Sequence, residues 1–156
     1  MEKISLMAVL SLIFMISVAS MCSKDDPIPQ SNPSVDPTPV INIVNNGTWR
    51  VTFYEDSGVN EISNYTGYNF TFGSSSTLTA TNGTNTYTGS WSVTSDNSGD
   101  DSPSNDLDFN ISFSAPVTFV DLTDDWNILE YTTTKVRLIH VSGGNGGTDY
   151  ITFEKN

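Results

Sequence analysis

The chain has 156 residues, with 18 acidic and 6 basic side chains and a formal net charge of −12. The basic residues are few and unclustered, which excludes a nucleic-acid partner, because contacts to phosphates need gathered Lys and Arg. One histidine and one cysteine exclude a zinc site built from several His or Cys ligands, and we expect neither a metal nor a cofactor. The length allows one domain.

Residues 1–21 have the features of a secretory signal. Lys3 precedes an almost wholly apolar stretch, and small residues then lead to Cys22. This pattern resembles a bacterial lipoprotein signal, which implies that Cys22 is lipidated and holds the protein to a membrane. The following Ser23-Lys24-Asp25-Asp26 resembles the acidic export tag of Bacteroidota lipoproteins, which implies the outer membrane and exposure at the cell surface. The alternative is an uncleaved membrane anchor, because the apolar stretch is borderline for spanning a bilayer.

Residues 22–40 are predicted to be a proline-rich linker. They hold five of the seven prolines, and proline neither donates to a sheet nor continues a helix. Such an extended segment is either a spacer between the lipid and the domain or a connector with no required length. The domain itself is predicted to occupy residues 41–156.

The first predicted strand, 47–54, shows the pattern that recurs along the domain. Trp49, Val51 and Phe53 alternate with polar residues, and a period of two is typical of a half-buried strand. Seven more strands are predicted, at 68–72, 77–81, 85–93, 106–113, 126–131, 135–141 and 149–154. Asn82-Gly83 predicts a tight hairpin, and Gly89 predicts a bulge.

One short helix is predicted between the strands. Pro116 suits its first position, and we expect Phe119 and Leu122 to plug one end of the fold. Residues 61–65 predict a further helical turn. Eight short antiparallel strands joined by turns predict an all-β, up-and-down barrel without exposed sheet edges. A two-sheet sandwich is the alternative.

Gly47, one spacer residue and Trp49 at the start of the first strand resemble the first motif of the lipocalins. The region from Gly47 to Lys155 is similar to the small lipocalin-like domains of Bacteroidota lipoproteins. The resemblance implies a lipocalin-like barrel with Trp49 at its closed end and an arginine of a late strand packed across that ring. Arg137 is the matching residue, because Arg50 points away from Trp49.

The residues predicted to point inward are aromatic. They are Trp49, Phe53, Tyr68, Phe70, Phe72, Tyr87, Trp91, Phe109, Phe113 and Phe153. An eight-stranded barrel is just wide enough to be filled by side chains or to hold one small ligand, and such bulky rings favour a packed core. The alternative is a pocket near the open end, with candidate lining residues Tyr68, Phe70, Tyr87, Trp91 and Phe109.

The sequence shows no recognisable catalytic constellation. His140 has no acid close to it in sequence, and the Ser and Thr residues lack a positioned base. Glu55-Asp56 and Asp124-Asp125 are sequence neighbours, which cannot show the separation that a glycosidase cleft needs. We expect the acidic segment 96–106 to be a solvated loop, with a calcium site as the alternative because its side chains offer many oxygen ligands.

We therefore expect a surface-anchored lipoprotein that binds without catalysis. Its ligand would be a small apolar molecule or a glycan at the barrel mouth, or a protein at the loops. The alternatives are a protease inhibitor and a structural accessory of an outer-membrane complex.

Overall fold

The computed structural model describes residues 35–95, 106–144 and 146–156. All of them belong to the second of two units into which the chain divides, Ser31–Asn156. The predicted signal, Cys22 and nearly all of the acidic segment 96–106 lie outside the described residues. Within the described ranges, no helix has the length and apolar character needed to cross a membrane.

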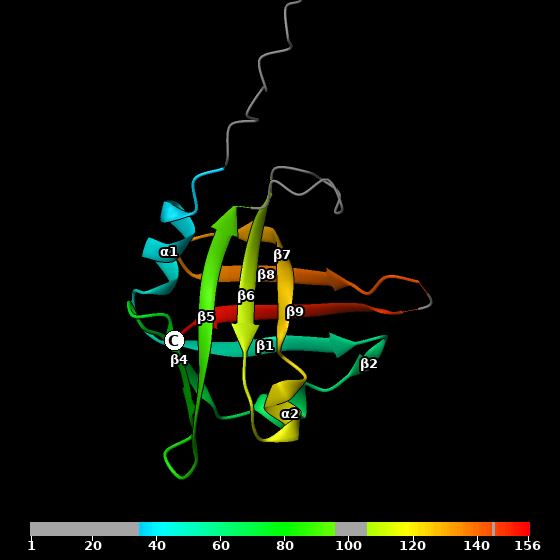
Figure 1. Ribbon diagram of the computed structural model, residues 1–156. Coiled ribbons are helices and arrows are strands. Elements are labelled where there is room, and N and C mark those ends of the chain that lie inside the picture. The colour runs from blue at the N-terminus through cyan, green and yellow to red at the C-terminus, as the bar shows by residue number, and fades with distance from the viewer. Residues whose placement is uncertain (1–34, 96–105, 145) are drawn as a thin grey trace, which may run out of the picture. The chain divides into compact units, whose positions relative to one another are not determined.

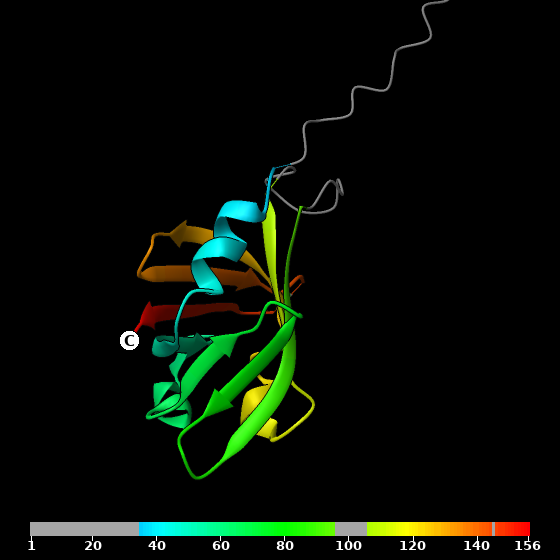
Figure 2. The ribbon, with the colours of Figure 1, turned by 90° about the vertical axis from the view of Figure 1, so that its left-hand side faces the viewer.

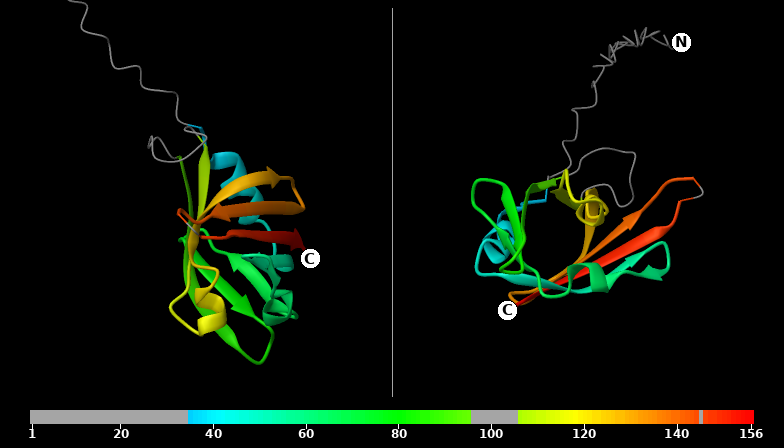
Figure 3. Two further views of the ribbon diagram at one scale, coloured as in Figure 1. Left: turned by 90° about the vertical axis from the view of Figure 1, so that its right-hand side faces the viewer. Right: turned by 90° about the horizontal axis from the view of Figure 1, so that it is seen from below.

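Nine strands of the described residues form one sheet. They are β1 (Trp49–Asp56), β2 (Val59–Asn60), β3 (Asn69–Phe72), β4 (Thr77–Thr81), β5 (Thr86–Ser95), β6 (Leu107–Ser112), β7 (Asp124–Tyr131), β8 (Lys135–Val141) and β9 (Thr148–Lys155). β1 pairs with both β3 and β9, so the sheet closes on itself (Figure 1). β2 is only a two-residue extension beside β1, so the other eight strands make a closed antiparallel barrel. This confirms the predicted up-and-down barrel and excludes the sandwich, and Figure 3 shows the ring of strands from below.

In the part of the chain that the structure describes, three short helices flank the barrel: α1 (Thr38–Val44), the 3-10 helix η1 (Ile62–Tyr65) and α2 (Val117–Val120). α1 lies beside Trp91, Ser92 and Val93, near the end of β5. Phe119 of α2 contacts Tyr87, near the start of β5. The two α-helices therefore lie at opposite ends of the barrel, as Figures 1 and 2 show. We call these the α1 end and the α2 end; β7 and β9 begin, and β8 ends, at the α2 end.

Helix α1 begins inside the segment predicted to be an extended linker, so the prediction is wrong for its last residues. Val40 and Val44 are buried in the core, and Nε1 of Trp49 donates a hydrogen bond to the carbonyl oxygen of Val44 at 2.9 Å. Pro39 lies in the first turn of the helix, where its missing N–H has no intrahelical partner to lose. A proline pattern that indicates an extended tether is therefore equally compatible with a helix start.

Phe53 is not inward, contrary to the prediction. The pairing of β1 with β9 shifts register between Val51 and Phe53, which inserts Thr52 as an extra residue and inverts the alternation beyond it. Trp49 and Val51 point into the core before the bulge, and Tyr54 does so after it, whereas Phe53 is 38% exposed. The bulge therefore places Tyr54 in the core and Phe53 at the surface.

Gly89 does not form the predicted bulge. The pairing of β4 with β5 runs through it without a register shift. A Cβ atom at this position would collide with the carbonyl oxygen of Ser112 and lie 2.8 Å from the ring of Phe113. The glycine instead lets β5 approach the end of β6 closely.

Candidate functional site

Aromatic side chains fill the barrel interior. Three of the five candidate lining residues, Phe70, Trp91 and Phe109, are buried in the core. The ring of Phe72 lies 5.4 Å from Trp91, 5.5 Å from Phe109 and 5.5 Å from Phe153, and Phe153 lies 5.4 Å from Phe70. These rings pack against one another instead of surrounding a space, which favours the packed core over the pocket.

The other two candidate lining residues, Tyr68 and Tyr87, lie at the α2 end. Their rings stack at 5.8 Å and pack on Phe119 at 5.0 and 4.7 Å. Phe119 and Leu122 are buried, so they plug this end as predicted. Hydrogen bonding between the two hydroxyl groups raises the pKa of Tyr87 above its usual value of 10.0. The pair therefore offers polar groups beside an end that Phe119 closes.

Trp49 is packed against a lysine. Nζ of Lys155 lies 5.7 Å from the Trp49 ring centroid. Arg137 instead pairs with Glu130 at 3.5 Å on the outside of the barrel, because its sequence neighbours on β8 take the buried positions. The implied arginine is thus wrong, although Gly47 does mark a special backbone position, with φ at +94°.

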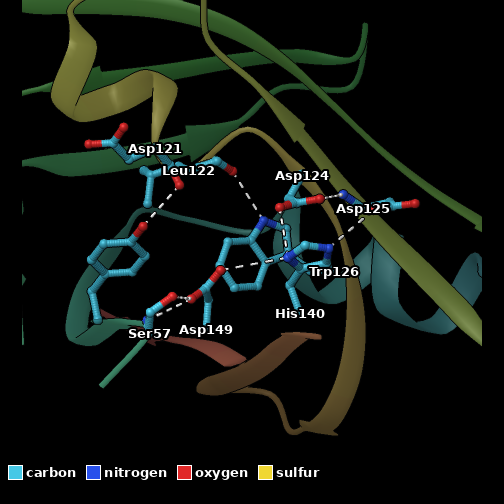
Figure 4. Close-up of polar contacts among 9 residues, drawn as sticks. Ser57, Asp121, Leu122, Asp124, Asp125, Trp126, His140 and Asp149 are labelled. Atoms are coloured by element: carbon cyan, nitrogen blue, oxygen red, sulfur yellow. Dashed lines mark hydrogen bonds and ion pairs between the residues drawn. The ribbon is translucent and has the colours of Figure 1, made fainter. Parts of the chain in front are cut away.

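A cluster of ionisable side chains, which we call the His140 cluster, consists of Asp124, His140 and Asp149 at the α2 end. Nδ1 of His140 is 2.8 Å from Oδ2 of Asp124 and 3.6 Å from Oδ2 of Asp149 (Figure 4). His140 and Asp149 are direct cross-strand partners on β8 and β9. The side chains of Asp124, His140 and Asp149 are 29%, 21% and 16% exposed. The cluster is therefore mostly shielded from water.

The inward rows of three strands lead to the His140 cluster. Its members lie two positions along β7, β8 and β9 from the buried residues Trp126, Leu138 and Ile151, and successive side chains of a strand alternate between its faces. The ring of Trp126 lies 6.1 Å from the imidazole. The cluster thus continues the apolar core as a polar layer at one end of the barrel.

Each carboxylate of the His140 cluster is held through the oxygen that faces away from the imidazole. The backbone N–H of Ser57 donates to Oδ1 of Asp149 at 2.8 Å, and the backbone N–H of Asp125 donates to Oδ1 of Asp124 at 3.0 Å. Ser57 reaches Asp149 because Gly147 has no side chain, and a Cβ atom there would collide with the Ser57 hydroxyl. The Oδ2 atoms are left facing His140.

The surroundings of the His140 cluster make a bound positive charge favourable. Burial raises the pKa of Asp124 above its usual value, the neighbouring Asp125 raises it further, and attraction to His140 opposes both effects. Nδ1 of His140 is itself buried and forms no hydrogen bond. Asp125 stays outside the cluster, with its side chain 65% exposed and its Oδ1 4.0 Å from Nε2. The cluster can bind a proton or a cation.

The sequence contained part of the signal for the His140 cluster. The alternation along each strand places all three members on an inward row, but the acids are far from His140 in sequence. Strand pairing brings Asp149 opposite His140, and this register is not readable from a single strand. Asp124 and Asp125 behave as expected of sequence neighbours, because one joins the cluster and the other points to solvent.

Comparisons with known proteins give one likeness in structure. No family model matches the chain, and no curated protein matches it. The crystal structure of a DUF4847 family protein from Bacteroides vulgatus is similar to it, with a TM-score of 0.46 and 18% sequence identity, over 75% of this chain and 97% of that one.

Proposed function

We propose that the protein is a lipid-anchored, non-enzymatic binding protein of the outer membrane, exposed at the cell surface, that binds a protein partner at its α2 end. The observation that carries this proposal is the packed interior. An aromatic core of mutually contacting rings is a rigid scaffold, and it leaves the outer surface and the loops as the places for recognition.

The chain supports the α2 end as the recognition surface in two ways. The described residues begin directly before α1, so the chain enters the barrel at the α1 end. Exposed apolar side chains also occur on the elements of this end: Val59, Val117, Val120 and Val141 are 58%, 74%, 38% and 61% exposed. Half of the exposed large apolar side chains of the described residues therefore lie on these elements, and exposed apolar side chains favour a protein interface.

The negative charge of this protein indicates the charge of the surface that would bind it. Asp121 and Asp125 are exposed at the α2 end, and the whole chain carries a net charge of −12. Opposite charge accelerates encounter and excludes acidic partners by repulsion. We therefore expect a partner whose contact surface is basic around an apolar centre.

Site-specific photo-crosslinking in the native membrane tests this proposal. A photoreactive residue replaces Val117 at the α2 end, and the matched control replaces Leu129, which is 49% exposed on β7 towards the α1 end. We expect a discrete protein adduct from position 117 and none from position 129, and a lower yield in 0.5 M salt (roughly a 4 Å screening length). Equal adducts at both positions, or an adduct only at 129, would contradict the proposal. A protease in the adduct would favour the inhibitor alternative.

A further inference from the structure

We propose that Asp124, His140 and Asp149 bind one divalent transition-metal ion of the zinc class. The ligands would be Nδ1 of His140 and one Oδ2 atom from each aspartate. This site is independent of the proposed partner and lies at the α2 end, where the three inward strand rows terminate.

The separations of the three atoms suit a common ion. Nδ1 of His140, one oxygen of Asp124 and one oxygen of Asp149 all lie within 4.8 Å of one another. Ligands about 2.0–2.2 Å from a tetrahedral zinc ion lie about 3.4 Å apart. The observed separations from Nδ1, 2.8 and 3.6 Å, bracket that value. Small side-chain movements would therefore admit the ion.

The imidazole nitrogen is not satisfied by hydrogen bonding. Nδ1 of His140 is inaccessible to solvent and has no hydrogen-bond partner, although a carboxylate oxygen lies 2.8 Å away. A buried polar atom that makes no hydrogen bond is costly, and here only the ion pair with Asp124 offsets that cost. An ion between the nitrogen and the two oxygens would satisfy all three atoms at once.

The surrounding contacts resemble the outer shell of a metal site. Ligating side chains are commonly oriented by hydrogen bonds to their other polar atom. Ser57 and Asp125 supply such bonds from backbone N–H groups to Oδ1 of Asp149 and Asp124. The Trp126 ring beside the imidazole restricts its movement. The side chains of Asp124, His140 and Asp149 are 29%, 21% and 16% exposed, so solvent reaches the cluster.

The types of the three ligand atoms indicate which class of ion would bind. Calcium prefers six to eight oxygen ligands, whereas one imidazole and two carboxylates suit zinc and neighbouring transition metals. Three protein ligands also leave a coordination position for water or for a side chain of another molecule. The two carboxylates are largely shielded from water, and a divalent cation would neutralise their negative charge.

Isothermal titration calorimetry with zinc chloride tests the site. The full chain is kept in detergent, treated with EDTA and transferred to a buffer that does not bind metals. We expect one zinc per chain beyond any weak surface binding, which is common to all variants. His140→Gln and Asp149→Asn should weaken binding at least about 10-fold, and the control Asp125→Asn should stay within about 3-fold. Equal binding by His140→Gln and the unchanged protein would overturn the proposal.

Thermal unfolding with and without zinc distinguishes the loss of the metal site from the misfolding of a variant. Zinc that binds the folded state alone raises the unfolding temperature, in proportion to the logarithm of its concentration. We expect zinc to raise Tm in the unchanged protein and in Asp125→Asn, and to leave it unchanged in His140→Gln. Near-ultraviolet circular dichroism shows whether each variant keeps its tertiary packing. A Tm in the unchanged protein that does not respond to zinc would also overturn the proposal.

Discussion

Two buried tyrosine hydroxyl groups hold the α2 region against the barrel. Tyr54 donates to the carbonyl oxygen of Asp121 at 2.9 Å, and Tyr65 donates to that of Thr118 at 2.6 Å. The two rings also meet edge to face at 5.0 Å. Burial, more than the nearby acids, raises the pKa of both tyrosines above the usual value of 10.0. The folded state therefore favours their neutral, hydrogen-bonding form.

These shifts predict a loss of stability in alkali. As the pH rises past about 10, tyrosines of the unfolded chain lose their protons while Tyr54 and Tyr65 keep theirs, so the unfolded state binds fewer protons and the free energy of unfolding falls. Tyr54→Phe should make this fall shallower and should cost about 1–3 kcal/mol at neutral pH, because the partly buried hydrogen bond to the carbonyl oxygen of Asp121 is lost. Urea denaturation from pH 8 to pH 11 measures both effects. The exposed Tyr131→Phe is the control, and a slope for Tyr54→Phe equal to that of the control would refute the assignment.

Helix α2 packs on the barrel core through one buried aromatic side chain, Phe119. The ring of Phe119 lies within 4.7–6.0 Å of five other aromatic rings: Tyr65, Tyr68, Phe70, Tyr87 and Phe113. Its neighbours on the helix, Val117 and Val120, face outward. A helix of four residues has little stability of its own, so this ring contact fixes its position.

Removing the plug should destabilise the barrel and open a cavity at the α2 end. We expect Phe119→Ala to lower the free energy of unfolding by about 3–5 kcal/mol, because the site cannot collapse fully around the missing ring. Val120→Ala, one position away and 38% exposed, should change it by less than about 1 kcal/mol. Urea denaturation compares the two, and an apolar fluorescent dye should bind Phe119→Ala more than the unchanged protein. Equal losses for both variants would mean that Phe119 is not the plug.

At the scale of the whole molecule, local patterns in the sequence were sufficient to predict the barrel. Alternation and turn residues predicted the eight barrel strands and the helix with Phe119. The differences come from interactions between distant segments. The bulge at Thr52 depends on the pairing of β1 with β9, and the cation beside Trp49 comes from Lys155 at the far end of the chain. The His140 cluster needed strand register in the same way, since no single segment contains all its members.

Native mass spectrometry of the full protein, released gently from its own membrane, tests the central claim that the barrel is filled and acts through its outer surface. We predict a mass that exceeds the polypeptide only by covalent lipid, and by metal where present. Cys22→Ser should lack the lipid and leave the membrane fraction. An additional organic molecule that remains bound to the folded protein and is removed by solvent extraction, in the unchanged protein and in Cys22→Ser alike, would contradict the claim and show that the barrel holds a ligand.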